Sequence, residues 1–299
     1  MAIARTAGVV LDRAAAGVRA RSPAAEAWRR LRRNRLAMLG AVILAAMVTV
    51  AALTPWLAPY PYAKTDLAYG AKPPSRGHLL GTDELGRDLL TRIMWGARVS
   101  LGVGILATLV SLTIGVSYGA LAGYLGGRAD QLMMRFVDIL YGLPFMFFVI
   151  ILMVVFGRNI FNLFIALGAV QWLTMSRIVR GQVLTLKVRE FVQAARALGG
   201  SPLRILALHL VPNTAGPIIV YATLTVPAVM LEEAFLSFLG LGVQPPMASW
   251  GSLASEGAAA MEPYPWLIVY PGLTLTVTLF SLNFLGDGLR DALDPQVAR

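Results

Sequence analysis

Six long apolar segments constrain the fold of this chain more than any other feature of its sequence. A bilayer whose hydrocarbon core is about 30 Å thick is crossed by a helix of roughly 20 apolar residues, and each segment is close to or above that length. Charged residues make up only 14% of the chain, against about 25% in soluble domains. The sequence therefore predicts an all-α membrane protein. Its six transmembrane helices are expected near residues Leu36–Leu57, Val99–Leu125, Phe136–Phe156, Ile160–Ile178, Leu208–Met230 and Trp266–Leu285.

The positions of arginine and lysine predict the orientation of these helices, because cytoplasmic loops carry the excess of basic residues. Residues 1–35 are rich in arginine, and residues 179–207 combine several basic side chains with Glu190 as their one acid. Residues 231–265 contain no lysine or arginine. Both termini and the 179–207 segment are therefore expected in the cytoplasm. Residues 58–98 carry mixed charges and are expected outside, since an even number of crossings must separate the two basic segments.

Composition divides the chain into four parts. Residues 1–35 form a cytoplasmic tail ending in an interfacial helix anchored by Trp28, and we assign no function to the tail up to Arg21. Residues 36–98 hold the first span and the external segment. Residues 99–290 hold the core, and residues 291–299 form a second cytoplasmic tail.

The net charge of +10 is attributed to orientation in the lipid bilayer and not to nucleic-acid binding. The chain has no cysteine, which excludes disulfides and thiolate metal ligands. Its two histidines, His78 and His209, are far apart in the sequence and give no metal-ligand spacing. No metal site is therefore expected.

A pair of short helices is predicted between the fourth and fifth spans, in the stretch from Phe191 to Asn213. Apolar residues recur there at helical spacing, and Gly199-Gly200 supplies a stop. Ser201 can cap a second helix that begins with Pro202. The pattern alone fits two interpretations equally well. It could be an ordinary interfacial helix, or it could be a surface offered to a soluble partner.

This stretch resembles the EAA loop of the membrane subunits of ABC importers, in which EAA is followed three residues later by Gly and further on by Ile-x-Leu-Pro. Here the pattern reads Gln193-Ala194-Ala195, then Gly199, and later Val211-Pro212. Gln193 replaces the family glutamate, so a neutral hydrogen bond is expected there, and His209 replaces the family isoleucine. The resemblance implies that residues 187–204 hold a coupling helix that docks on an ATP-hydrolysing subunit. The implied coupling residues are Glu190, Gln193, Ala194, Ala195, Arg196, Gly199, Ser201, Arg204 and Pro212.

Two further motifs are similar to the peptide and nickel importer group, and specifically to its C-type permease chain. They are GTDELGRDLLTRIMWGARVSLGVG at residues 81–104 and SFLGLGVQPPMASWGSL at residues 237–253. The resemblance implies the transmembrane domain of a type I ABC importer in the cytoplasmic (inner) membrane of a bacterium or archaeon. Its implied partners are a homologous second permease, two ATPase subunits that bind ATP and Mg, and an external substrate-binding protein. The implied cargo is a di- or oligopeptide, with nickel and glutathione as alternatives within the group.

No motif indicates that the chain is itself an enzyme or holds a cofactor. It lacks the GxxxxGK[ST] phosphate loop, so ATP hydrolysis would belong to partner subunits, and it lacks the HExxH metal motif. The rival interpretation is a self-contained secondary transporter or channel. That would predict inverted repeats and midplane ion ligands, which the sequence does not display. An intramembrane enzyme would need a nucleophile–base pair within the spans, and none stands out.

The external motif comprises Gly81, Thr82, Asp83, Gly86, Arg87 and Asp88. It could bind a ligand. Alternatively, its charged residues, together with Glu84, pair locally and set the angle of a helix on the outer leaflet.

The candidates for the translocation path are Asp138, Met146, Glu232 and Glu233. Asp138 could line the path or pair with Arg135. Glu232 and Glu233 are expected directly after the fifth span at its outer mouth, where they could attract cations or simply form a solvated helix end. Adjacent carboxylates point to different faces of a helix, so at most one of the two would face a pore.

Overall fold

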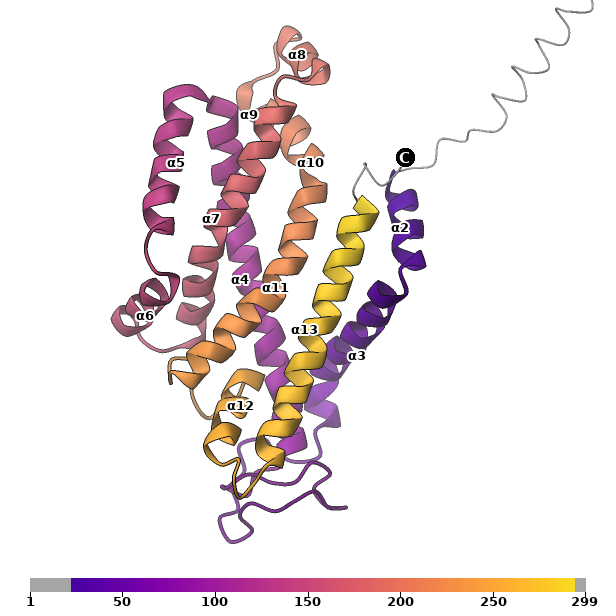
Figure 1. Cartoon of the computed structure of the whole chain (residues 1–299), viewed down its shortest axis with the longest axis vertical. Helices are drawn as coiled ribbons and strands as arrows, with labels where there is room; N and C mark the ends of the chain where they lie inside the picture. The colour runs from indigo at the N-terminus through magenta and orange to yellow at the C-terminus, as the bar shows by residue number, and fades with distance from the viewer. Residues whose placement is uncertain (1–22, 294–299) are drawn as a thin grey trace, which may run out of the picture.

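The computed structural model describes residues 23–293, so the N-terminal tail up to Arg21 and most of the predicted C-terminal tail lie outside the described residues. The described chain is a bundle of helices (Figure 1). In chain order they are α2 (Pro23–Arg33), α3 (Arg35–Leu57), α4 (Leu89–Leu125), α5 (Gly127–Tyr141), α6 (Phe145–Phe156), α7 (Ile160–Leu186), α8 (Glu190–Ala197), α9 (Pro202–Ile205), the π-helix η1 (Leu206–Leu210), α10 (Val211–Asn213), α11 (Ala215–Phe238), α12 (Trp250–Ala259) and α13 (Trp266–Leu293).

Five of these helices are long and apolar enough to cross a membrane, namely α3, α4, α7, α11 and α13. The predicted span at Phe136–Phe156 is a bent pair instead of one straight helix, because α5 and α6 meet at 82°. Pro144 explains the break, since proline lacks a backbone N–H and keeps the residue before it out of the helical region. Counted as one broken span, the pair brings the total to the six crossings that the sequence predicts.

Several predicted span boundaries are wrong. The broken span begins at Gly127 instead of Phe136, α7 ends at Leu186 instead of Ile178, and α13 ends at Leu293 instead of Leu285. The second span begins at Leu89, well before Val99, because Asp88 caps the helix by accepting a hydrogen bond from the Thr91 N–H at 2.8 Å. The fifth span begins at Ala215, after Leu208, and continues to Phe238. Glu232 and Glu233 therefore lie inside α11 and not after its end.

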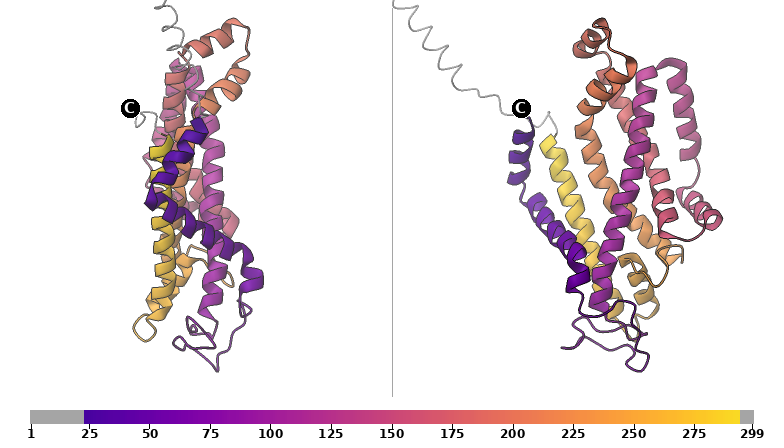
Figure 2. Two further views of the ribbon diagram at one scale, coloured as in Figure 1. Left: turned by 90° about the vertical axis from the view of Figure 1, so that its right-hand side faces the viewer. Right: turned by 180° about the vertical axis from the view of Figure 1, so that it is seen from behind.

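Helices α4 and α7 form the spine of the bundle. Gly115, Gly119 and Gly123 recur every four residues along α4 and face α7 so closely that a Cβ atom at any of them would strike α7. Small residues at this spacing let two membrane helices pack backbone to backbone. Seen edge-on in Figure 2, the helices form a narrow slab, with the α8 segment (residues 187–204) projecting beyond its upper end.

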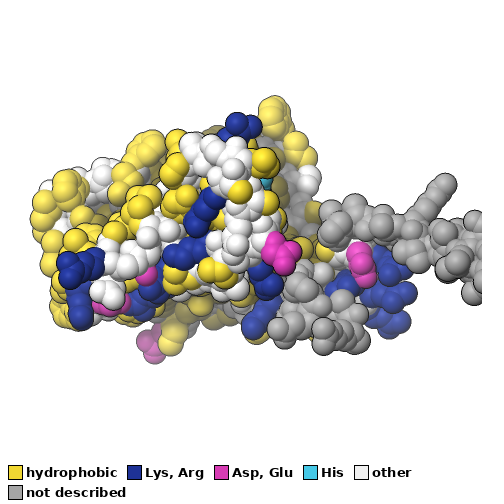
Figure 3. Space-filling view, turned by 90° about the horizontal axis from the view of Figure 1, so that it is seen from above, with side chains coloured by type: hydrophobic (Ala, Val, Ile, Leu, Met, Phe, Trp, Pro, Cys, Tyr) yellow, Lys and Arg dark blue, Asp and Glu magenta, His cyan; other side chains and the backbone are white. Residues whose placement is uncertain are grey.

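The two ends of the bundle differ in what they carry. Helix α8, the start of α5, the end of α13 and helix α2 lie at one end, whereas residues 58–88 and α12 lie at the other (Figure 1). The view onto the α8 end in Figure 3 shows Lys and Arg side chains at several places on that face. The described part of the first basic segment, residues 23–35, thus shares one end with residues 179–207, as the charge-based orientation requires.

Candidate functional site

The α8 segment is attached to the bundle by one buried residue and presents most of its other side chains to solvent. Val192 is fully buried and packs with Val183, Ile205 and Leu210, which come from α7, α9 and η1. Leu198 is 89% exposed. The predicted apolar face is therefore divided, since Val192 and Ala195 pack inward while Val188, Phe191 and Leu198 remain outside.

Local backbone chemistry ends α8 and starts α9 as the sequence predicts. Gly199 has φ +80°, a left-handed conformation that glycine adopts without strain, and its N–H donates to the Arg196 carbonyl at 2.9 Å. The Ser201 hydroxyl oxygen then accepts from the Arg204 N–H at 3.4 Å, with Pro202 at the first position of the new helix. Gln193 donates from Nε2 to the Val188 carbonyl at 3.0 Å, so the amide that replaces the family glutamate stabilises the turn before its own helix.

Two basic side chains tie this segment to the end of α4. Lys187 Nζ donates to the carbonyl of Gly123 at 2.7 Å, where the last carbonyls of α4 have no helical partner. The Arg196 guanidinium lies 5.3 Å from the centre of the Tyr124 ring. The α8 segment is thus joined to α4 by contacts far apart in the sequence.

Pro212 accounts for the short π-helix η1, which lies just before it in the chain. Proline cannot donate a backbone hydrogen bond, and its ring crowds the preceding turn. The Val211 N–H reaches back to the Leu206 carbonyl, which widens the turn. Asn213 Nδ2 then donates to the His209 carbonyl at 2.6 Å. Pro212 therefore shapes the link between the α8 segment and α11 and is itself exposed.

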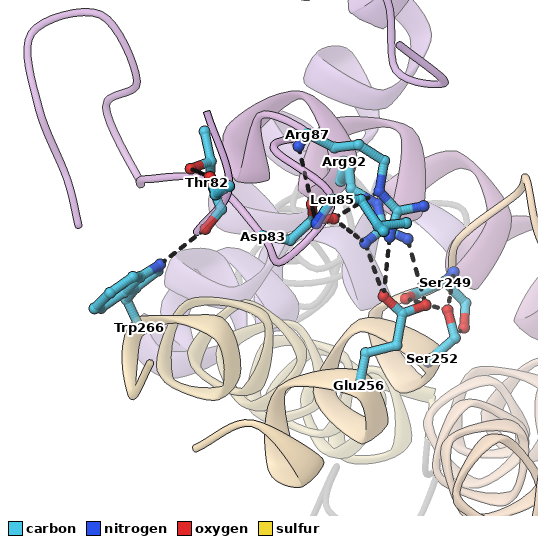
Figure 4. A network of polar contacts seen from close by, with 10 residues as sticks. Thr82, Asp83, Leu85, Arg87, Arg92, Ser249, Ser252, Glu256 and Trp266 are labelled. Carbon is cyan, nitrogen blue, oxygen red and sulfur yellow. Dashed lines mark hydrogen bonds and ion pairs between the residues drawn. The ribbon is translucent and has the colours of Figure 1, made fainter. Parts of the chain in front are cut away.

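At the opposite end, the external motif forms a buried polar network (Figure 4). Asp83 accepts from Arg87 Nε at 2.7 Å and from Arg92 Nη1 at 2.8 Å. Arg92 is only 2% exposed and also donates to Glu256 of α12 at 2.8 Å. Asp88 lies 2.8 Å from His78 Nδ1, while Glu84 is exposed. Local ion pairing is therefore present, but Arg92 and Glu256, which complete it, were missed because they lie outside the short motif.

The remaining members of this motif shape the external segment. Gly86 has φ +71°, and a Cβ there would strike the backbone of Asp66. Gly81 has φ +83° and lies against Lys72 and Trp266 in the same way. Thr82 donates to the Gly70 carbonyl at 2.7 Å and accepts from Trp266 through its backbone oxygen at 3.2 Å. These contacts hold residues 66–88 against α13.

Asp138 does not take the partner that its sequence neighbourhood suggested. It accepts from Arg177 Nη2 of α7 at 2.7 Å, and the Arg177 guanidinium lies 4.3 Å from the centre of the Tyr141 ring. Closer to the α8 end of the bundle, Arg180 of α7 donates two hydrogen bonds to Asp130 of α5, at 2.5 and 2.7 Å. These pairs connect α5 to α7 across a basic groove of about 800 Å³. Neighbours in the sequence could not reveal them, because the partners come from different helices.

The two adjacent glutamates of α11 point to different surroundings. Glu233 is fully buried and accepts from the hydroxyls of Ser237 and Ser249 at 2.8 and 2.6 Å, which fixes the start of α12. Glu232 accepts from Gln171 Nε2 of α7 at 2.7 Å and lines a cavity beside the α5–α6 break. Met146 is half-buried and packs in the core between α6 and α7. Of the four predicted path residues, Asp138, Met146, Glu232 and Glu233, only Glu232 lines that cavity.

Metal ligands do not gather anywhere in the described part of the chain, residues 23–293. No group of three or more His, Asp or Glu side chains there could hold a metal ion. In this part of the chain, the carboxylates of Asp83 and Asp130 are paired with arginines, and that of Glu233 with hydroxyls.

Comparison with protein families assigns most of the chain. Residues 115–299 match the family described as "Binding-protein-dependent transport system inner membrane component". Residues 22–74 match the "N-terminal TM domain of oligopeptide transport permease C".

Individual relatives agree with these matches over nearly the whole length. The oligopeptide transport system permease protein of Haemophilus influenzae is 52% identical over 91% of this chain and 88% of its own. The dipeptide transport system permease protein of Bacillus subtilis is 48% identical over 92% of this chain and 86% of its own.

The fold is also similar to a solved structure. A chain of the MetNI methionine ABC transporter, in inward-facing conformations, superposes with a TM-score of 0.53 at 16% sequence identity. The match covers 67% of this chain and 94% of that one. At this identity the likeness concerns the fold alone.

Proposed function

Because this chain belongs to the family of binding-protein-dependent transport system inner membrane components, we propose that it is one of two permease subunits of an ATP-driven peptide importer. Its partners would be a homologous permease, two ATPase subunits that bind ATP and Mg, and an external substrate-binding protein. The chain would lie in the cytoplasmic (inner) membrane of a bacterium or archaeon. Support for a peptide cargo comes from relatives that are named as oligopeptide and dipeptide permeases. None of the relatives described above is named for nickel.

The geometry of the α8 segment is the observation that supports an ATPase partner. It projects beyond one end of the bundle (Figure 1). Both apolar and charged side chains are exposed on it. Apolar anchors surrounded by charged residues are typical of a docking surface. We assign the docking residues to the exposed side of α8 and the turn after it: Glu190, Phe191, Gln193, Ala194, Arg196 and Leu198.

The same contacts suggest how the ATPases would drive transport. Two ATPase subunits that close on ATP would displace α8. Val192 would pass that displacement to the packed ends of α7 and α9, and Lys187 and Arg196 would pass it to α4. The break at Gly142–Pro144 lets α5 and α6 change their angle without bending a continuous helix. Alternating access then follows from differential stabilisation of two states.

Substitution of Ala194 tests the docking surface, because this residue is exposed on α8. Ala194→Trp adds bulk to the surface of α8 without filling space inside the bundle. We expect the ATPase subunits to be lost from the purified complex while the permease stays inserted. Ala129→Trp, at an exposed position at the start of α5, is the matched control and should retain them. Normal ATPase recovery and peptide uptake by Ala194→Trp would contradict the assignment. Uptake by this chain without any ATPase would favour the secondary-transporter interpretation.

A further inference from the structure

A cavity inside the bundle, away from the exposed side of α8, has the composition of a ligand site. It is a cavity of about 310 Å³ beside the α5–α6 break, between α7 and α11. Ligand pockets in proteins usually measure about 300–1,000 Å³. The residues that line it include Tyr141, Phe145 and Phe148 from the broken span, Gln171 and Thr174 from α7, and Glu232 from α11.

The polar groups of this cavity are suited to a cation. Among residues 23–293, Glu232 is the one acidic residue that lines it, and no lysine or arginine there does. The hydroxyls of Tyr141 and Thr174 lie 3.1 Å apart, within hydrogen-bond distance. Because a hydroxyl has two acceptor lone pairs, each oxygen can still accept a hydrogen bond from a ligand. The aromatic rings of Phe145 and Phe148 attract cations through their ring quadrupoles, whereas the Tyr141 ring already lies 4.3 Å from the Arg177 guanidinium. By contrast, four arginines line the groove nearer the α8 end.

Glu232 is only partly satisfied by its protein neighbours. Its Oε1 accepts from Gln171, but Oε2 is buried and accepts no hydrogen bond from any residue between 23 and 293. A buried carboxylate oxygen without a donor is costly, so a donor from a ligand would be favourable. Rotation about the terminal torsion of a glutamate is broad and brings either oxygen toward the cavity.

We propose that Glu232 recognises a primary ammonium group of the cargo as it passes through the membrane. The inference rests on the proposed peptide-import function, since a peptide carries such a group at its amino terminus and on every lysine. Gln171 holds the carboxylate in place, and the hydroxyls and aromatic rings surround the ammonium. Glu233 takes no part, because it is buried against α12.

A labelling experiment tests the site without relying on transport. The chain has no cysteine, so Thr174→Cys places one thiol of this subunit in the cavity of the full complex. The probes are 2-aminoethyl methanethiosulfonate, which carries a primary ammonium, and the anionic 2-sulfonatoethyl reagent. We expect Glu232→Gln to lower the ratio of their labelling rates about tenfold. Glu262→Gln, at an exposed residue outside the cavity, should leave the ratio unchanged. A ratio that survives Glu232→Gln overturns the proposal.

An uptake experiment then identifies the source of the ammonium. Proteoliposomes contain the complete importer with the same binding protein for wild type and Glu232→Gln. Peptide binding outside the membrane is therefore the same in both, and any difference in uptake arises in the permease. Glu232→Gln should lower the uptake of trialanine about tenfold and leave N-acetyl-trialanine unchanged. A similar loss for N-acetyl-Ala-Lys-Ala would extend recognition to lysine, whereas no loss would confine it to the amino terminus.

The two proposals fail in different ways. Equal trialanine uptake by wild type and Glu232→Gln would overturn the role of Glu232 and leave peptide import standing. If wild type imports no peptide but the labelling ratio still depends on Glu232, the peptide cargo is wrong and the ammonium site stands. Glu232→Asp keeps the charge and should retain most of the labelling preference.

Discussion

At the scale of single residues, one buried guanidinium joins three segments of the external end. Arg92 of α4 bonds Asp83 of the external segment and Glu256 of α12, and both bonds are 2.8 Å long (Figure 4). Burying a charge is costly unless it is paired and hydrogen-bonded. The position of α12 over α4 is therefore coupled to the fold of residues 66–88, which cover the same end of the bundle.

Replacing this arginine should destabilise the external end. Arg92→Met removes the charge but keeps much of the side-chain volume, so Asp83 keeps only Arg87 as an ionic partner. We expect a loss of about 1–3 kcal/mol in the free energy of unfolding, because hydrogen bonds to charged groups are lost in a buried site. Thermal unfolding of the purified protein measures it. Arg76→Met, at an exposed position in the same segment, should melt like wild type. Equal melting of the two variants would argue against the network.

Some of these residue-level contacts could be foreseen from the sequence and others could not. The pairing of Asp83 with Arg87 was predictable because the two lie four residues apart. Asp138 instead takes Arg177, thirty-nine residues away, in place of nearby Arg135. Which basic residue reaches a carboxylate depends on how α5 and α7 pack, and a single sequence does not contain that information.

At the scale of elements, the α8 segment is both separate from the bundle and tied to it. Helix α8 itself has eight residues, which are too few to form a stable helix alone. Burial of Val192 and the donation from Lys187 to the Gly123 carbonyl hold it against α4 and α7. A docked partner would therefore move the ends of two spans and not an independent loop.

Loss of the lysine contact should loosen this element. Lys187→Met removes the donor to the Gly123 carbonyl while keeping an aliphatic stem of similar length. We expect faster amide hydrogen exchange in residues 190–197, by roughly the factor of 2–12 that a bond of about 0.5–1.5 kcal/mol implies. Arg189→Met, at the exposed residue before α8, should exchange like wild type. Unchanged exchange in Lys187→Met would show that Val192 alone fixes the element.

At the scale of the whole molecule, the arrangement of charge agrees with the arrangement of helices. The α8 segment lies at the end of the bundle opposite to residues 58–88 and α12 (Figure 1). Short loops rich in arginine and lysine remain on the cytoplasmic side. A chain with this distribution is expected to expose α8 inside the cell and the 58–88 segment outside.

Single cysteines test this topology directly because the chain has none of its own. Leu198→Cys, in the turn after α8, should react with a membrane-impermeant maleimide only in inverted vesicles. Glu84→Cys, in the exposed part of the external segment, should react only in intact cells or spheroplasts. Both thiols become accessible in detergent, which controls for reactivity. Labelling of both positions from the same side would overturn the orientation.

The class of the molecule could be predicted from the amino-acid sequence, because the properties involved are local. Apolar length predicts the crossings, basic residues predict their orientation, and Gly199, Ser201 and Pro202 place the ends of α8 and α9. The roles of the charged residues inside the bundle depend instead on how the helices pack. Glu232 and Glu233 are adjacent and chemically identical, yet one lines a cavity and the other is buried against α12. Their difference arises from the helices that face each side of α11, and those neighbours are brought together by packing across long stretches of chain.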